Sequence, residues 1–169
     1  WRRKCATVQI EEPSGILYST CTVEGEVMEG PEGSSIWTVA HFLLLVDEEF
    51  ALQQYHLARE QLGAITLGFG YAREGPDSWE GQMDIDSGPV IPVVKISAGS
   101  SGQALVAAAA FDDHEFFSAL NTALDFAAFP KEDDQGMRYC ASNQVGDAVL
   151  LYSMILGPLW NEVKRMGGK

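Results

Sequence analysis

Two aspartates, Asp84 and Asp86, stand just before Pro89, a residue suited to the first turn of a helix. The amino-terminal end of a helix carries partial positive charge, which stabilises ionised carboxylates or a bound anion. Two such carboxylates can divide the roles of general acid and general base if their surroundings differ. Alternatively, Asp86 or Ser87 merely caps the helix, since both residue types are favoured caps. We therefore predict Asp84 and Asp86 as catalytic residues, with capping as the structural alternative.

Aromatic and charged side chains precede this pair in a glycine-rich segment, residues 63–88. A loop of this length is uncommon in a compact domain unless it is functional. Aromatic rings can stack on sugars or hydrocarbon while an arginine fixes the orientation of a ligand. Tyr71, Arg73 and Trp79 are therefore candidate substrate-binding residues. The alternative is an ordered loop that packs its own aromatic side chains.

A second polar cluster accompanies the helix start expected near Ser35. It brings the carboxylate of Glu32, a third candidate catalytic residue, and the indole of Trp37, a candidate for binding substrate. His41 lies one helical turn beyond Trp37, and its ordinary pKa near neutrality suits a general base. Alternatively, His41 is a hydrogen-bonded packing residue on an apolar helix.

A third polar cluster, around Arg138, precedes the helix start expected near Asn143. Arg138 could bind a substrate carboxylate or pair with a carboxylate of the protein itself. Three polar clusters, each placed before a helix, are the pattern expected when helices direct the same ends toward one cavity. This coincidence is the main argument for a functional site.

The composition excludes several classes of partner. Lys and Arg total 11 against 24 Asp and Glu, so the formal charge of −13 would repel nucleic acid or anionic lipid. No apolar run approaches the roughly 20 residues needed to span a bilayer. Three widely spaced cysteines indicate reduced thiols, which favours a soluble protein of the cytoplasm. No motif supports a metal or another cofactor.

Apolar residues at helical spacing, with caps and stops, predict a series of helices. Short links between them favour antiparallel hairpins, so the predicted fold is all-α, with an N-terminal loop or β-hairpin segment over residues 1–34 and a helical domain over residues 35–169. The expected helices run from Ser35 to Val46, from Asp47 to Gly63, from Pro89 to Ile96, from Gln103 to Phe111, from Asp112 to Phe129 and from Asn143 to Met166.

Several stretches resemble a group of uncharacterised bacterial proteins, whose helical pattern is similar to the linalool dehydratase/isomerase-like and six-hairpin glycosidase-like (α/α) toroids. The stretches are Gly30 to Trp37, Asp47 to Ala51 with Gln54 and Tyr55, Gly68 to Gly70 with Arg73 and Glu74, and Asp84 to Pro89. The resemblance implies inner and outer rings of helices and a ligand funnel at one end. The helices starting near Ser35, Pro89 and Asn143 would be inner.

The chain is about half as long as a complete ring would require, so the resemblance implies a partial toroid. An open half-ring exposes apolar faces, which soluble monomers avoid. A second copy or the remainder of a larger chain would therefore complete it. The function implied is that of a hydrolase or lyase acting on a carbohydrate or small neutral molecule, with the paired aspartates as acid and base. The alternative is a non-catalytic helical-hairpin interaction or structural module.

Overall fold

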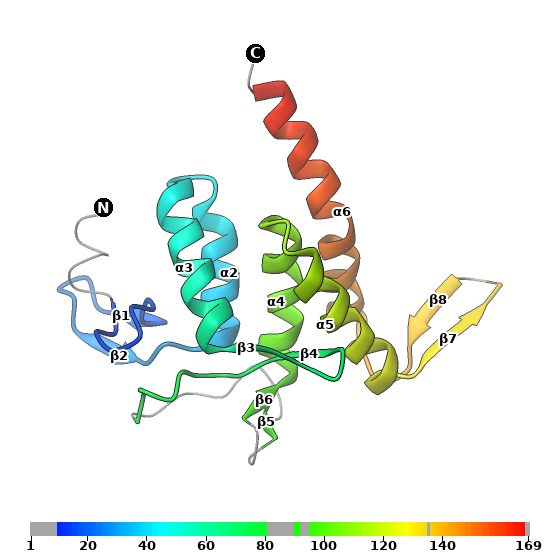
Figure 1. The fold of residues 1–169 in the computed structure, drawn as a ribbon, viewed down its shortest axis with the longest axis horizontal. Helices are drawn as coiled ribbons and strands as arrows, with labels where there is room; N and C mark the ends of the chain where they lie inside the picture. The colour runs from blue at the N-terminus through cyan, green and yellow to red at the C-terminus, as the bar shows by residue number, and fades with distance from the viewer. Residues whose placement is uncertain (1–9, 81–89, 92–94, 135, 168–169) are drawn as a thin grey trace.

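The computed structural model describes residues 10–80, 90–91, 95–134 and 136–167. Within them, five helices alternate with four two-stranded antiparallel sheets (Figure 1). The helices are α2 (Gly33–Leu43), α3 (Glu48–Gln61), α4 (Ala98–Ala110), α5 (His114–Ala127) and α6 (Gln144–Gly167). The strands are β1 (Thr20–Cys21), β2 (Val27–Glu29), β3 (Gly63–Thr66), β4 (Phe69–Ala72), β5 (Val90–Ile91), β6 (Ile96–Ser97), β7 (Pro130–Asp133) and β8 (Gly136–Tyr139).

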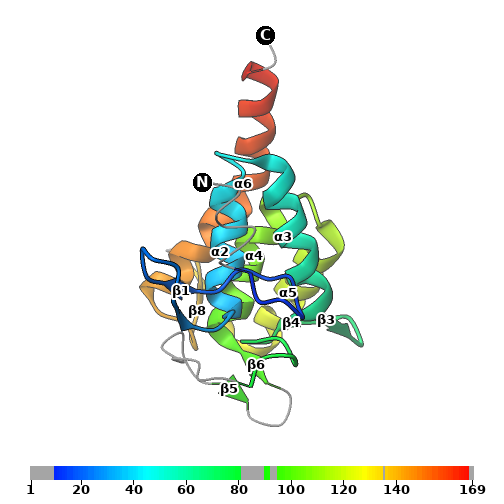
Figure 2. The same cartoon turned by 90° about the vertical axis from the view of Figure 1, so that its left-hand side faces the viewer.

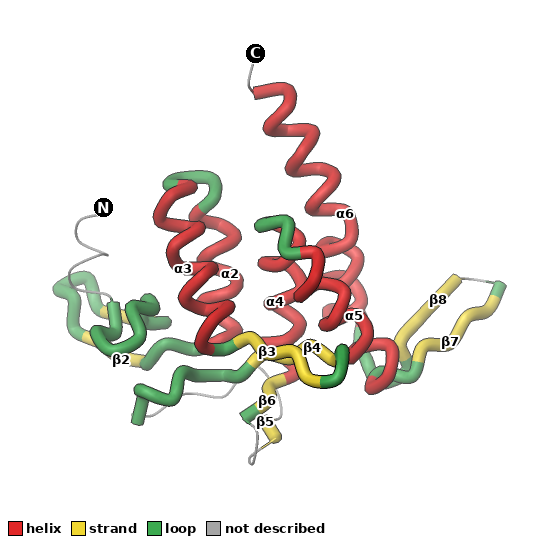
Figure 3. The backbone as a smooth tube through the Cα atoms, viewed as in Figure 1, coloured by secondary structure: helices red, strands yellow, loops and turns green. Residues whose placement is uncertain are grey.

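The predicted all-α fold is wrong, because hairpins are interleaved with the helices. Figure 3 shows three of these hairpins, β3–β4, β5–β6 and β7–β8, near the lower ends of the helices. The expected N-terminal loop or hairpin contains the β1–β2 pair, and a separate bridge joins Ile10 to Leu17. The predicted division into residues 1–34 and 35–169 stays a prediction.

The partial toroid is also wrong for the described residues. α4 packs against α2, α5 and α6, and α2 packs in turn against α3. The helices therefore form a bundle around α4, and Figure 1 shows them side by side with no alternation of inner and outer rings. The fold is mixed α/β, and it does not have the architecture of the linalool dehydratase/isomerase-like or six-hairpin glycosidase-like proteins.

The β3–β4 hairpin lies in the glycine-rich segment, residues 63–88, that was expected to be a long loop. Its tip residues Leu67 and Gly68 have φ values of 53° and 84°, the left-handed conformation that a two-residue hairpin turn requires. A Cβ at Gly70 would lie 2.5 Å from the backbone nitrogen of Leu120. Gly70 therefore permits close packing of β4 on α5, and is not a sign of loop structure.

The helix expected from Pro89 to Ile96 is wrong in its described part, because Val90–Ile91 and Ile96–Ser97 form strands. Pro89 itself lies outside the described residues. The next helix, α4, starts at Ala98 and so before the expected Gln103, because the Ser97 hydroxyl accepts a hydrogen bond of 3.0 Å from the Ser100 amide. This cap stabilises a first turn rich in glycine and serine, which lies between the two helices that the sequence predicted.

The core lies where α2, α3 and α5 meet α4. The indole of Trp37 is fully buried and packs edge-on against Tyr55, at a ring-centroid distance of 5.9 Å. It also lies 6.0 Å from the ring of Phe116. The N-terminal segment joins this core because Gln54 accepts a hydrogen bond from the Leu17 amide at 3.0 Å. Among the described residues, none of the helices combines the length and apolarity needed to cross a membrane.

Asp113 links α3 to α5. Its carboxylate accepts hydrogen bonds from the Tyr55 hydroxyl at 2.8 Å, the Arg59 Nε at 3.0 Å and the Phe116 amide at 3.0 Å. Burial alone would raise the pKa of this carboxyl, but the hydrogen bonds from Phe116, Tyr55 and Arg59 outweigh it and hold the pKa below its ordinary value. Burial, followed by this bond to Asp113, raises the pKa of Tyr55.

We predict that Asp113→Ala lowers the free energy of unfolding by about 2–3 kcal/mol, because α5 loses its cap and the buried Tyr55 hydroxyl loses its acceptor. The difference from the unsubstituted chain should shrink as the pH falls below about 4, since the depressed pKa of Asp113 stabilises the fold only while the carboxyl is ionised. Chemical denaturation at several pH values measures both effects. Asp77→Ala is the control, because its carboxylate is 70% exposed and its ion pairs should contribute less than about 1 kcal/mol.

Candidate functional site

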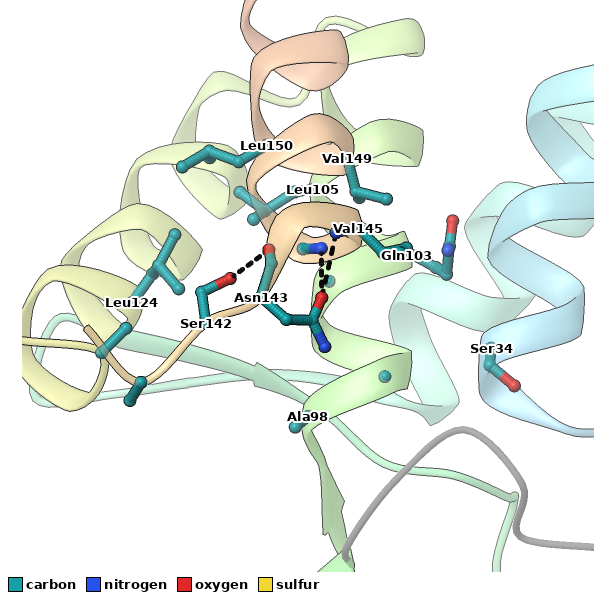
Figure 4. A pocket seen from close by; sticks show the side chains of 15 residues that line it. Ser34, Ala98, Gln103, Leu105, Leu124, Ser142, Asn143, Val145, Val149 and Leu150 are labelled. Atoms are coloured by element: carbon teal, nitrogen blue, oxygen red, sulfur yellow. Dashed lines mark hydrogen bonds between the residues drawn. The ribbon is translucent and has the colours of Figure 1, made fainter. Parts of the chain in front are cut away.

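Three helix amino termini converge on one pocket of about 430 Å³. The first turn of α2 contributes Ser34, that of α4 contributes Ala98 and Gly99, and that of α6 contributes Val145 and Gly146. Figure 4 shows Ser34 on one side and the start of α6 on the other. Of the three helix starts expected to face a common hollow, those near Ser35 and Asn143 share this pocket, while Pro89 lies outside the described residues and the third start in the pocket is Ala98.

The buried hydroxyl of Ser100 holds the starts of α2 and α4 together. It accepts a hydrogen bond from the Trp37 Nε1 at 3.1 Å and donates one to the Arg73 carbonyl at 2.9 Å. A Cβ at Gly33 would lie 2.3 Å from this hydroxyl, so only glycine lets α2 start so close to α4. These contacts fix two of the three helix ends around the pocket.

The wall of the pocket is mainly apolar, and its polar groups are amides and hydroxyls. Side chains from α4, α5 and α6 form the apolar part: Leu105, Leu124, Ala128, Val145, Val149 and Leu150. The polar groups are Ser34, Gln103, Ser142 and Asn143 (Figure 4). Within the described lining, none of the side chains is titratable at ordinary pH. The pocket therefore offers hydrogen bonds to a neutral group and an apolar surface to the rest of a ligand.

At each of the three helix starts, side chains of the protein already accept from one or two first-turn amides. Asn143 Oδ1 accepts from the amides of Val145 at 3.0 Å and Gly146 at 2.9 Å. Glu74, which is 2% exposed, accepts from the Ser34 amide at 3.1 Å and from the Ser34 hydroxyl at 2.9 Å. Because side chains satisfy these donors, the convergent helix ends do not by themselves favour an anionic ligand.

Gly102 keeps the pocket open from within α4. A Cβ added at this position would meet nothing within 4 Å, and Gly102 has no positive φ. Glycine inside a helix costs about 0.5–1 kcal/mol relative to alanine. Neither backbone conformation nor close packing requires glycine here, in contrast to Gly33 and Gly70. The effect of having glycine at position 102 is therefore to leave space in the pocket.

The candidate catalytic residues are not assembled at this pocket by the described part of the chain. Asp84 and Asp86 lie outside the described residues. Glu32 is the residue before α2, is 6% exposed, and accepts a hydrogen bond of 3.4 Å from the Ser35 hydroxyl. Trp37 belongs to the core. Glu32 and Trp37 therefore stabilise the start of α2 and do not line the pocket.

Two candidate binding residues, Tyr71 and Arg73, share a different hollow of about 470 Å³. There Arg73 pairs with Asp77 at 2.8 Å and donates to the Gln61 carbonyl, while Lys95 pairs with the same Asp77 at 3.2 Å. These bonds hold the chain after β4 against α3.

The other two candidate binding residues, Trp79 and Arg138, lie elsewhere. Trp79 packs edge-on against Tyr18, with ring centroids 5.8 Å apart. Arg138 lies on β8, is exposed, and is 3.9 Å from the carboxylate of Asp133 on β7. Trp79 lies in the loop after β4 and Arg138 on the β7–β8 hairpin, and neither lines the pocket at the helix starts.

His41 connects α2 to α6. Its Nε2 lies 2.8 Å from the Tyr152 hydroxyl, while no described group bonds its buried Nδ1. Burial lowers the pKa of His41. The imidazole is thus held neutral in an interhelical contact, as in the packing alternative, and does not line the pocket.

Sequence reasoning missed Gly102, Gln103 and the apolar wall. The run from Gly99 to Gly102 lies between two predicted helices, so the sequence pattern placed it outside a helix and its part in the pocket was not foreseen. Among the protein families and curated proteins compared with this chain, no family model and no individual protein matches it. The case for function therefore rests on the geometry of the site.

We predict that the chain loses stability as the pH falls from about 7 to about 5, because the unfolded His41 takes up a proton near pH 6.5, whereas burial lowers the pKa of the folded one. His41→Gln, whose amide can still bond Tyr152, should remove this part of the pH dependence. Urea unfolding at the two pH values tests the prediction, with the exposed His114→Gln as the matched control. An unchanged slope in the His41 variant would contradict it.

Proposed function

We propose that this chain binds a small uncharged molecule, with an apolar body and one polar end, in the pocket at the starts of α2, α4 and α6. The volume of about 430 Å³ is in the range typical of ligand pockets. The apolar wall suits the body of such a molecule, and the amides of Asn143 and Gln103 suit its polar end. The observation that carries the proposal is Gly102, a helix-interior glycine whose only evident effect is to leave space.

Binding is the part of the function that the described residues support. A hydrolase or lyase needs an acid or base within hydrogen-bond reach of the reacting group. The described lining supplies none, so catalysis depends on Asp84 and Asp86, which stays a prediction. A ligand-binding module is accordingly the proposal, in agreement with the non-catalytic alternative and with the expected small neutral ligand.

The test compares Gly102→Leu with Gly102→Ala. Leucine at this position should occupy the part of the pocket beside α4, whereas alanine adds a single methyl group. Both should raise the free energy of unfolding or leave it unchanged, with a gain of about 0.5–1 kcal/mol for alanine. Loss of binding in the leucine variant would therefore reflect occupied space and not damage to the fold.

Benzyl alcohol and benzoate provide a matched pair of neutral and anionic probes. In ¹H–¹⁵N spectra, benzyl alcohol should shift the side-chain amides of Asn143 and Gln103 and the backbone amides of Gly99 and Gly146, and benzoate should shift them less. Gly102→Leu should abolish these shifts and Gly102→Ala should retain them. Shifts that persist in the leucine variant, or a stronger response to benzoate, would contradict the proposal.

A further inference from the structure

The last part of α6 extends beyond the helices that pack against it. Leu156, 3% exposed, is the last strongly buried residue of α6, and Leu159, Val163 and Met166 after it are about half exposed or more. Figures 1 and 2 show this end of α6 standing clear of the body in two perpendicular views. We call residues 159–167 the arm, which spans about 13 Å as a helix.

The end of the molecule from which the arm rises is a second exposed apolar surface. We call this surface the rim. It consists of the α2–α3 turn, residues 44–49, and the α4–α5 turn, residues 111–115. Leu45 and Val46 on the rim are 67% and 73% exposed. A hollow of about 110 Å³ lies where the two turns meet, with Leu44, Leu52 and Phe111 in its wall.

The arm and the rim are opposite in charge. The rim sequence contains no Lys or Arg and six Asp and Glu, of which Asp113 already pairs with Arg59. The arm sequence contains Lys164 and Arg165 against the single acid Glu162, which pairs with Arg165. In a chain with a formal charge of −13, the arm is a locally basic segment. Apolar side chains flanked by opposite charge are the features that allow two surfaces to recognise each other.

The base of the arm lies beside the rim of its own chain, because Asn161 lines a hollow together with Asp112 and His114. Beyond Asn161 the arm continues the axis of α6 and points away from the two turns (Figure 1). This outer part of the arm can therefore meet a rim only on another molecule. Two copies placed head to head, with their arms antiparallel, would bring each arm to the other copy's rim, and this arrangement closes with two-fold symmetry.

The exposed side chains of both surfaces are of the kind that such an interface buries. Leu45 and Val46 on the rim, and Leu159, Val163 and Met166 on the arm, are large apolar side chains that are 48–73% exposed. We propose that this chain forms a symmetric dimer in which the arm of each copy packs on the rim of the other.

Sedimentation equilibrium and light scattering test the dimer through its mass, expected at twice 18.4 kDa. The variant Leu159→Glu with Val163→Glu should be monomeric, because it places two carboxylates on the arm. The variant Leu45→Glu with Val46→Glu should also be monomeric, because it does the same on the rim. Val23→Glu with Leu67→Glu adds the same charge at sites 85% and 94% exposed elsewhere, and should remain dimeric.

Far-UV circular dichroism establishes that each variant is folded. If the unsubstituted chain is monomeric, the proposal is overturned, and the arm would then be a surface for binding a different protein. Dimers that survive the rim substitutions but not the arm substitutions would overturn it as well, because the arms would then pair only with each other. A mass above that of a dimer would exclude the closed two-fold arrangement.

Discussion

The hydroxyl of Ser100 is the contact on which the arrangement of helix ends depends. It is fully buried, and both its accepting and its donating capacity are used, by the Trp37 indole and the Arg73 carbonyl. One oxygen thus ties α2, α4 and the end of β4 at a single point. The absence of a Cβ at Gly33 makes this approach possible. Without the Ser100 hydroxyl, the first turns of α2 and α4 would separate, and the pocket between them would lose its shape.

The side-chain caps at these three helix starts explain why the pocket does not favour an anion. Each helix start brings its own cap: Glu74 for α2, Ser97 for α4 and Asn143 for α6. Convergent helix ends usually indicate an anion site, because their free amides point at the ligand. Here a side chain accepts from one or two of those amides at each start, and the space left between the helices has a mainly apolar wall.

The sequence predicted some elements well because strong local signals mark them. Asp47 accepts from the Phe50 amide at 3.0 Å and caps α3 as expected. For α5 the predicted cap was Asp112, whereas Asp113 is the residue that bonds the Phe116 amide. Both aspartates suit a cap, and which one serves is decided by its long-range bonds to Tyr55 and Arg59 rather than by local sequence.

The three hairpins after α2 were not predicted, and in β3–β4 the reason is that the glycines have two different uses. Gly68 serves a tight turn and Gly70 a close approach to α5, but in sequence both resemble loop residues. Since Tyr71, Arg73 and Arg138 lie on these hairpins or directly after them, the error in secondary structure displaced the predicted site. That helix starts share a cavity followed from the pattern of polar clusters. Which side chains of α4 line the cavity depends on how that helix is rotated in the bundle.

The pocket draws its wall from segments that are far apart along the chain, from Ser34 to Leu150. It is therefore incomplete until α6, the last described helix in chain order, has docked on α4 through Leu150 and Leu156. A molecule held in the pocket contacts both helices and so favours the docked state. Ligand binding and the docking of α6 are then one coupled equilibrium, in which a bound ligand stabilises the helix that completes its pocket.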